Sequence, residues 1–225
     1  DDSKNGHITG VSDHVTLTGK EQTFAPFFFR AFRYIRIEWE AGKAFELDMN
    51  NSGFCPYFYP LDETGYFRCS NEAYNKMWDV SKNTVKCCTH EIIVDCPYYE
   101  QQQYGMDSCL EMMFLLRMSN DKRPGEKLIK NLASSQLDDG LLQANFPSTD
   151  IQVIPSFSLY WIMSVREYFR ATGDAELVRK MTGTIDKVLE GCNSYLDKNG
   201  LFGVTNYWHY TDWVDRWYIG VPDGG

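Results

Sequence analysis

The chain has 225 residues, of which 43% are apolar, so it can bury a core and is not a disordered protein. Its net charge of −9 opposes a nucleic-acid backbone and an anionic membrane surface, and neither is an expected partner. The seven cysteines form no C-x-x-C pair, which argues against a zinc site and favours small buried thiols. We expect neither a metal nor a cofactor.

The first part of the chain has the pattern of β-structure. Alternation over residues 11–18 predicts one strand, and the aromatic and β-branched alternation over residues 27–39 predicts a strand of an antiparallel sandwich with one face buried. The elements expected to follow are a turn at 41–43, a strand at 45–49 and a last strand or crossover at 54–59.

The period becomes helical after the composition changes at residues 61–65. Ser70 is a suitable N-cap for a first helix that ends near residue 87. About five helices are expected in total, joined by short hinges and by two longer loops at 95–105 and 141–155.

Proline and glycine mark several of the expected helix ends. Pro124 and Pro155 each stand where they would occupy the first turn of a helix. Gly173 fits the left-handed residue that follows a helix, and Asp174 fits the N-cap of the next one. These signals predict helical hairpins in series, which form a simple bundle, a solenoid or a toroid of inner and outer helices. The lack of a fixed-length repeat argues against the solenoid.

Three carboxylates, Asp95, Glu100 and Asp107, lie in a stretch that contains no lysine or arginine. Pro97 and Gly105 indicate that residues 95–105 form an irregular loop and not a helix. A loop that carries acids and aromatic rings to the start of a helix is typical of an active-site edge.

Aromatic residues recur in polar surroundings at 207–210 and again at Asp212-Trp213. One interpretation is core packing. The other is a wall for a ligand that has both apolar faces and hydroxyl groups, as a sugar does.

The acidic loop resembles the signature loop of the α-L-rhamnosidases with an (α/α)6 toroid. Asp95-Cys96-Pro97 opens it, Glu100 follows Asp95 by five positions, and Asp107 follows Asp95 by twelve. Further motifs stand in the family's order: Phe32-Arg33-Tyr34, the run from Gly65 to Ser70, and Asp212-Trp213 with Trp217 and Gly220-Val221-Pro222.

The resemblance covers residues 24 to 225 and implies a multidomain fold of α and β parts. Residues 1–64 would be the tail of a β-sandwich domain, and residues 65–225 the first half of an (α/α)6 catalytic toroid. The chain would be an internal segment of a longer protein. In the commoner family loop, basic residues lie close to the acid, whereas Tyr99 and Gln101 flank Glu100 in this chain. This difference concerns which leaving group is preferred.

The activity implied is release of terminal α-L-rhamnose by an inverting mechanism, which needs a general acid and a general base. The resemblance makes Glu100 the acid. Asp95 and Asp107 are expected to keep Glu100 protonated by their negative charge and to accept hydrogen bonds from rhamnose hydroxyls. The base, a glutamate, is expected beyond Gly225, so the segment alone is expected to be inactive.

Trp213, Trp208 and Tyr104 are candidates for the wall of the sugar site, and Asp212 is a further acceptor for hydroxyl groups. Structural roles compete with these assignments: Asp95 as a cap of its loop, Asp107 as a helix N-cap and Trp213 as core.

The expected partner is a rhamnose-containing oligosaccharide or glycoside, and the oligomeric state is left open. Two other functions remain. One is a non-catalytic carbohydrate-binding protein of the same fold. The other is a lyase that acts on acidic sugars, for which Tyr98, Tyr99 and Tyr104 would be the relevant groups.

Overall fold

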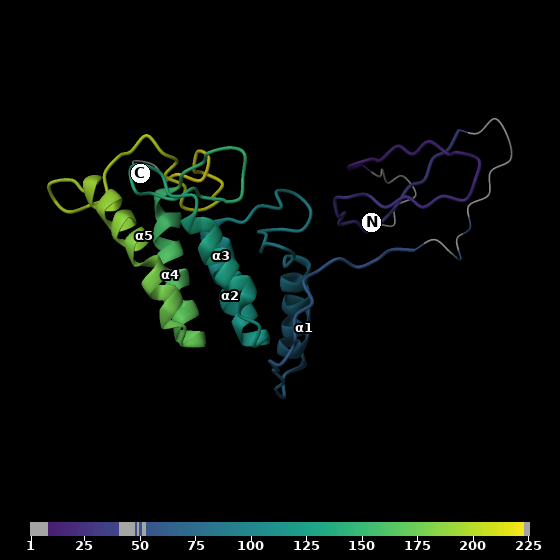
Figure 1. Cartoon of the computed structure of the whole chain (residues 1–225), viewed down its shortest axis with the longest axis horizontal. Helices are drawn as coiled ribbons and strands as arrows, with labels where there is room; N and C mark the ends of the chain where they lie inside the picture. Colours follow the sequence, from purple (N-terminus) through teal and green to yellow (C-terminus); the bar gives the residue numbers. More distant parts are fainter. Residues whose placement is uncertain (1–8, 41–47, 49, 51–52, 223–225) are drawn as a thin grey trace. The chain divides into compact units, whose positions relative to one another are not determined.

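The computed structural model describes residues 9–40, 48, 50 and 53–222. The chain forms two compact units, residues 1–57 and 58–225, and every helix of the described part belongs to the second unit (Figure 1). None of these helices is both long and apolar enough to cross a membrane.

The expected β-sandwich is wrong for the part of the chain that the structure describes. Residues 9–40 and 53–57 contain no strand. Phe32 and Trp39, expected on opposite faces of one strand, are 49% and 60% exposed, so neither face is buried. Alternation predicts a strand only where a neighbouring backbone supplies a ladder of hydrogen bonds and a second layer covers one face, and neither condition is met here.

Two of the expected β-elements lie outside the described residues. They are the turn at 41–43 and, except for Asp48, the strand at 45–49. The segment 54–59 is described and forms no strand.

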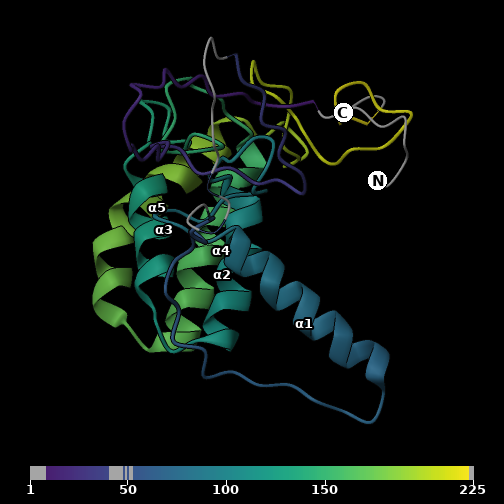
Figure 2. The same cartoon turned by 90° about the vertical axis from the view of Figure 1, so that its right-hand side faces the viewer.

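The prediction of five helices is confirmed. They are α1 (Glu72–Cys87), α2 (Gly105–Met118), α3 (Arg123–Ala133), α4 (Pro155–Thr172) and α5 (Ala175–Ser194). Helix α4 packs against α2, α3 and α5, and α1 contacts α2 (Figures 1 and 2).

Local signals placed most helix ends correctly. Pro124 and Pro155 lie in the first turns of α3 and α4. Gly173 has φ 71° after α4, and the Asp174 carboxylate accepts a hydrogen bond from the Leu177 N–H at 3.0 Å, which caps α5.

The cap expected at Ser70 is wrong by one residue. Asn71 caps α1 and accepts a hydrogen bond from the Ala73 N–H at 3.0 Å. The buried Asn75 side chain holds the preceding segment, because its amide bonds both the N–H and the carbonyl of Cys69. These two bonds fix where the helix starts.

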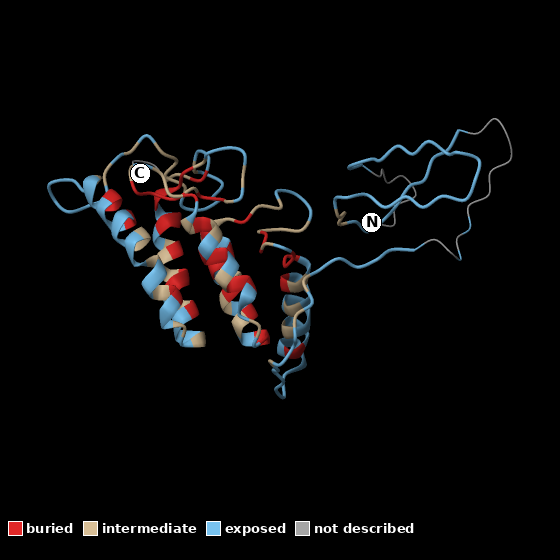
Figure 3. Ribbon diagram, viewed as in Figure 1, coloured by how far each residue is buried: buried red, intermediate tan, exposed pale blue. Residues whose placement is uncertain are grey.

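The core lies where α2, α3 and α4 face one another (Figure 3). Trp161 is completely buried, and its indole N–H donates to the Ile129 carbonyl at 3.0 Å, which ties α4 to α3. This packing fixes the ends of the helices from which the site loops project.

The longer connections gather at one end of the helices (Figure 1). They are the loop between α1 and α2, the loop between α3 and α4, and the segment that follows α5. The connections at the other end, between α2 and α3 and between α4 and α5, are short. All the candidate site residues therefore lie at the end with the long connections.

Candidate active site

The acidic loop is closed by two hydrogen bonds between Asp95 and Gln102. The Asp95 N–H donates to the Gln102 carbonyl at 2.9 Å, and the Gln102 N–H donates to Asp95 Oδ1 at 2.8 Å. Between them, Gln101 has φ 56°, a conformation uncommon outside glycine, and its side-chain amide donates to the Pro97 carbonyl at 2.9 Å. The sharp turn that results carries Glu100.

Backbone hydrogen bonds hold this loop against two other segments. They join, in order, Gly105 to Ala144, Ala144 to Gln152, and Val153 to Trp208. The start of α2, the loop between α3 and α4 and the segment after α5 are thus fixed side by side, although they lie far apart in the sequence.

Asp107 lies in the first turn of α2, and its expected role as the helix N-cap is wrong because Tyr104 holds that position. Its side chain remains accessible to solvent. Desolvation by the surrounding protein raises the pKa of the Asp107 carboxyl, and the negative charges of Asp95 and Glu100 raise the pKa further. A hydrogen bond from its own backbone N–H lowers the pKa. The three acids are therefore close enough to act on one another.

Glu111 is a fourth acid of this cluster, which sequence reasoning missed. It follows Asp107 by four positions on α2. Burial raises the pKa of its carboxyl to about 9, and the charges of Asp107 and Asp95 contribute. Its Oε2 is buried without a hydrogen-bond partner. The spacing of one helical turn after Asp107 was the signal that could have identified it.

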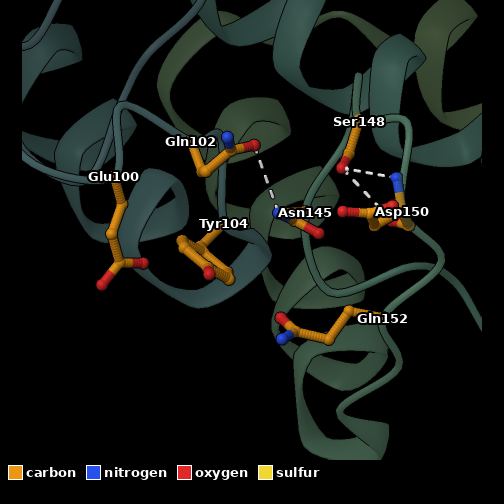
Figure 4. Close-up of a pocket in the computed structure, with 7 residues that line it drawn as sticks. All are labelled: Glu100, Gln102, Tyr104, Asn145, Ser148, Asp150 and Gln152. Carbon is orange, nitrogen blue, oxygen red and sulfur yellow. Dashed lines mark hydrogen bonds between the residues drawn. The ribbon is translucent and has the colours of Figure 1, made fainter.

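Glu100 is exposed at the edge of a cleft of about 300 Å³ (Figure 4). Tyr104 lines the same cleft. Burial raises the pKa of the Tyr104 hydroxyl well above its usual range, and a hydrogen bond to the carboxylate of Glu100 raises it further. The phenol therefore stays protonated as a donor beside Glu100.

A series of ring contacts leads from Tyr104 to Trp213. The ring centroids of Tyr104 and Phe157 are 6.2 Å apart, those of Phe157 and Tyr210 6.2 Å, and those of Tyr210 and Trp213 5.3 Å. Burial raises the pKa of Tyr210, and the charges of Asp212, Asp107 and Glu100 contribute. Sequence reasoning missed Phe157 and included Tyr210 only within the aromatic stretch at 207–210, and these two rings connect Tyr104 to Trp213.

The two candidate tryptophans differ in their environment. Trp213 is 67% exposed, so its alternative role as core is wrong. The side chain of Asp212 is exposed and accepts a hydrogen bond from the Trp213 N–H at 2.7 Å. Trp208 is half-buried, and its indole N–H donates to the Ile219 carbonyl at 3.0 Å.

The family model described as the bacterial alpha-L-rhamnosidase six-hairpin glycosidase domain matches residues 62–222 of the chain. The chain belongs to this family.

Individual members of the family resemble parts of the chain. An α-L-rhamnosidase of Formosa agariphila is 34% identical over 83 residues, which are 37% of this chain and 8% of that protein. The crystal structure of the GH78 family rhamnosidase of Bacillus sp. GL1 has a TM-score of 0.66 and 29% identity, and the match covers 69% of this chain and 16% of that one.

A rhamnosidase from Klebsiella oxytoca, solved with rhamnose bound, has a TM-score of 0.61. Its identity is 18%, over 75% of this chain and 32% of that one, so it supports the fold alone. The chain thus spans a minor part of the length of each of these proteins.

Within this rhamnosidase-family domain, interactions connect the seven residues that the sequence analysis named for the site. Electrostatic interaction links Asp95, Glu100, Asp107 and Tyr104, and ring contacts link Tyr104 to Trp208 and Trp213. Asp212 joins the group through its effect on Tyr210. In the described residues, no group of three or more His, Cys, Asp or Glu side chains is placed to hold a metal ion.

The cysteines are all free, and the expectation of buried thiols is confirmed for some of them only. Cys88, Cys109 and Cys192 are buried, Cys96 is half-buried, and the other three are exposed: Cys55, Cys69 and Cys87.

Proposed function

We propose that this chain carries the acid-bearing part of a glycoside hydrolase that releases terminal α-L-rhamnose from rhamnosides with inversion of configuration. The observation that carries the proposal is the closed acidic loop, which presents Glu100 at a cleft beside Asp95 and Asp107. The family of the chain supports the substrate class.

Glu100 would act as the general acid. Cleavage of the glycosidic bond leaves an electron pair on the departing oxygen, and Glu100 would deliver the proton that this oxygen requires. The Tyr104 hydroxyl, which stays protonated, would orient the carboxyl of Glu100.

The sugar would be held by acceptors and by aromatic rings. Asp107 and Asp212 offer carboxylates to the hydroxyl groups of rhamnose, and charged acceptors make the stronger hydrogen bonds of this kind. For Asp95 only Oδ2 is free for this role, because Oδ1 already accepts from the loop backbone. The exposed face of Trp213 would cover the apolar side of the sugar ring, with Trp208 behind it.

The general base would come from a part of the family domain that this chain does not contain. An inverting enzyme needs room for a water molecule between its two carboxyl groups, which are ~6.5 to 9.5 Å apart in such enzymes. We therefore expect no turnover from the 225-residue chain alone. Activity is to be measured on the full-length protein, by which we mean this chain joined to the remaining hairpins.

The test compares Glu100→Gln with the parent on two aryl rhamnosides. With a poor phenolic leaving group, loss of the acid should reduce kcat about 10²- to 10⁴-fold. With dinitrophenolate, which departs without a proton, the loss should be much smaller. Glu190→Gln is the matched control, because Glu190 is an exposed acid of α5, a helix that contacts α3 and α4.

Equal activity of Glu100→Gln and the parent on the poor leaving group would refute the assignment of the acid. Proton NMR of the first sugar released reports the stereochemistry, and inversion requires β-L-rhamnose as the initial product. Binding of rhamnose without any turnover by the full-length protein would instead indicate a non-catalytic carbohydrate-binding protein.

A further inference from the structure

The cleft beside Glu100 is built from two segments (Figure 4). The loop before α2 and the loop between α3 and α4 contribute the lining side chains, which are Glu100, Gln102, Tyr104, Asn145, Ser148, Asp150 and Gln152. The backbone bonds of Ala144 to Gly105 and to Gln152 hold the two segments in place. The walls of the cleft are therefore formed before any ligand arrives.

Two acceptors in this lining have no donor. Asn145 is 7% exposed, and its amide nitrogen donates to Gln102 Oε1 at 3.2 Å, while its Oδ1 is buried without a partner. Gln152 Oε1 is also buried without a partner. In Figure 4 the amide nitrogen of Asn145 points to Gln102, and its oxygen points to the other side, where Asp150 and Gln152 lie. Buried acceptors without partners are costly, so a ligand that donates hydrogen bonds would be favoured here.

The charge of the lining has one sign. Glu100 and Asp150 supply carboxylates, and none of the seven lining residues is a lysine, arginine or histidine. A ligand carboxylate would meet repulsion from Asp150 and, once Glu100 has given up its proton, from Glu100 as well, and the carboxylate itself offers no donor to the oxygens of Asn145 and Gln152. A neutral ligand with several hydroxyl groups meets neither penalty.

We propose that this cleft is the subsite for the leaving group and that it selects a neutral, hydroxyl-rich group, such as a hexose unit, over one that carries a carboxylate. The inference rests on the proposed function, because Glu100 as the proton donor defines the side on which the leaving group lies. The glycosidic C–O bond breaks, its oxygen takes the proton of Glu100, and the hydroxyl so formed remains in the cleft. Water supplies the hydroxyl of the released rhamnose.

The first test uses two disaccharides that differ in one group. α-L-Rhamnosyl-(1→4)-D-glucose and its glucuronate counterpart are compared by kcat/KM with the full-length protein, and 4-nitrophenyl α-L-rhamnoside reports the chemistry independently. The glucose disaccharide should be preferred by tenfold or more. Asp150→Lys should shift this ratio at least tenfold toward the glucuronate, whereas the control Asp186→Lys, on the exposed side of α5, should not.

The second test does not depend on turnover. A crystal structure of the full-length Glu100→Gln protein with rhamnosyl-glucose should place hydroxyl groups of the glucose ring within hydrogen-bond distance of Asn145 Oδ1 and Gln152 Oε1. This arrangement would support the subsite directly.

Each adverse outcome has one meaning. A preference for the glucuronate, an Asp150→Lys ratio equal to that of the parent, or a glucose ring bound away from Asn145 and Gln152 overturns the subsite. The proposed function then still stands if 4-nitrophenyl rhamnoside is hydrolysed. If the parent hydrolyses none of the three rhamnosides, the proposed function fails, and this inference fails with it.

Discussion

Asp95 binds Gln102 through both its backbone N–H and its side-chain carboxylate. The two bonds close a loop that contains Glu100, so one residue of the conspicuous acidic motif has a structural duty besides any contact with a ligand. The position of Glu100 then depends on Asp95 as much as on its own neighbours.

Replacement of Asp95 should loosen this loop. Asp95→Ala removes a hydrogen bond to a charged acceptor, which is worth about 1.5 to 3 kcal/mol. We expect amide hydrogen exchange at Gln102 to become at least tenfold faster, with kcat for rhamnoside hydrolysis reduced. Asp95→Asn, which keeps an oxygen acceptor, should be affected less. Asp138→Ala is the control, because Asp138 is an exposed acid in another loop. Unchanged exchange at Gln102 in Asp95→Ala would contradict this role.

Tyr104 should affect activity more than stability when it loses only its hydroxyl. Tyr104→Phe keeps the ring contact with Phe157 but removes the donor beside Glu100. We expect about a tenfold lower kcat and a change of less than about 1 kcal/mol in the free energy of unfolding. Tyr98→Phe, in an exposed residue of the same loop, is the control. A stability loss with kcat unchanged would show that the hydroxyl serves the fold instead.

Glu111 should make the stability of the fold depend on pH. Its pKa is about 9 in the folded protein and near 4.5 when unfolded, so the unfolded chain loses this proton first as pH rises. The stability it contributes is complete below pH 4.5 and declines as pH rises toward 9. Glu111→Gln removes that decline.

The measurement for Glu111 is urea unfolding of the full-length protein at pH 5 and pH 8. Between pH 5 and pH 8, the free energy of unfolding of Glu111→Gln should rise by about 2 kcal/mol relative to that of the parent. A fully buried carboxyl would give a larger change over this range, but the Glu111 side chain keeps some contact with solvent. Glu190→Gln should show no such difference. The same gain at both pH values would mean that Glu111 does not titrate in this range.

The sequence predicted the helices because their ends have local causes. Proline in a first turn, a left-handed glycine and a capping aspartate act within a few residues, as they do around Gly173 and Asp174. The β-sandwich failed for the opposite reason. A strand requires partners elsewhere in the chain or outside it, and the alternation around Phe32 carries no information on whether they are present.

The residues of the candidate site likewise fall into those that local sequence predicts and those that depend on distant contacts. The spacing of Asp95, Glu100 and Asp107 is local and could be predicted. The contribution of Tyr210 and of Asn145 depends on contacts between loops that are far apart in sequence, and the aromatic stretch at 207–210 did not by itself distinguish Tyr210 from its neighbours. Such residues emerge only when the helices fix which loops lie side by side.

Gly220 should be intolerant of any side chain, although it lies outside the helices. Its φ is 76°, and a Cβ at this position would lie 2.5 Å from the ring of Tyr210. That ring belongs to the aromatic series of the site, because it contacts Trp213. Gly220→Ala combines backbone strain with displacement of Tyr210 and Trp213. Such strain costs on the order of 1 to 3 kcal/mol. We therefore expect a higher KM for rhamnosides and faster proteolysis of the segment after α5.

The control is Gly183→Ala, in the middle of α5 with open space around its Cβ, which should be neutral or stabilising by up to about 1 kcal/mol. If both variants behaved alike, the position of the Trp213 loop would not depend on the close approach of Gly220 to Tyr210.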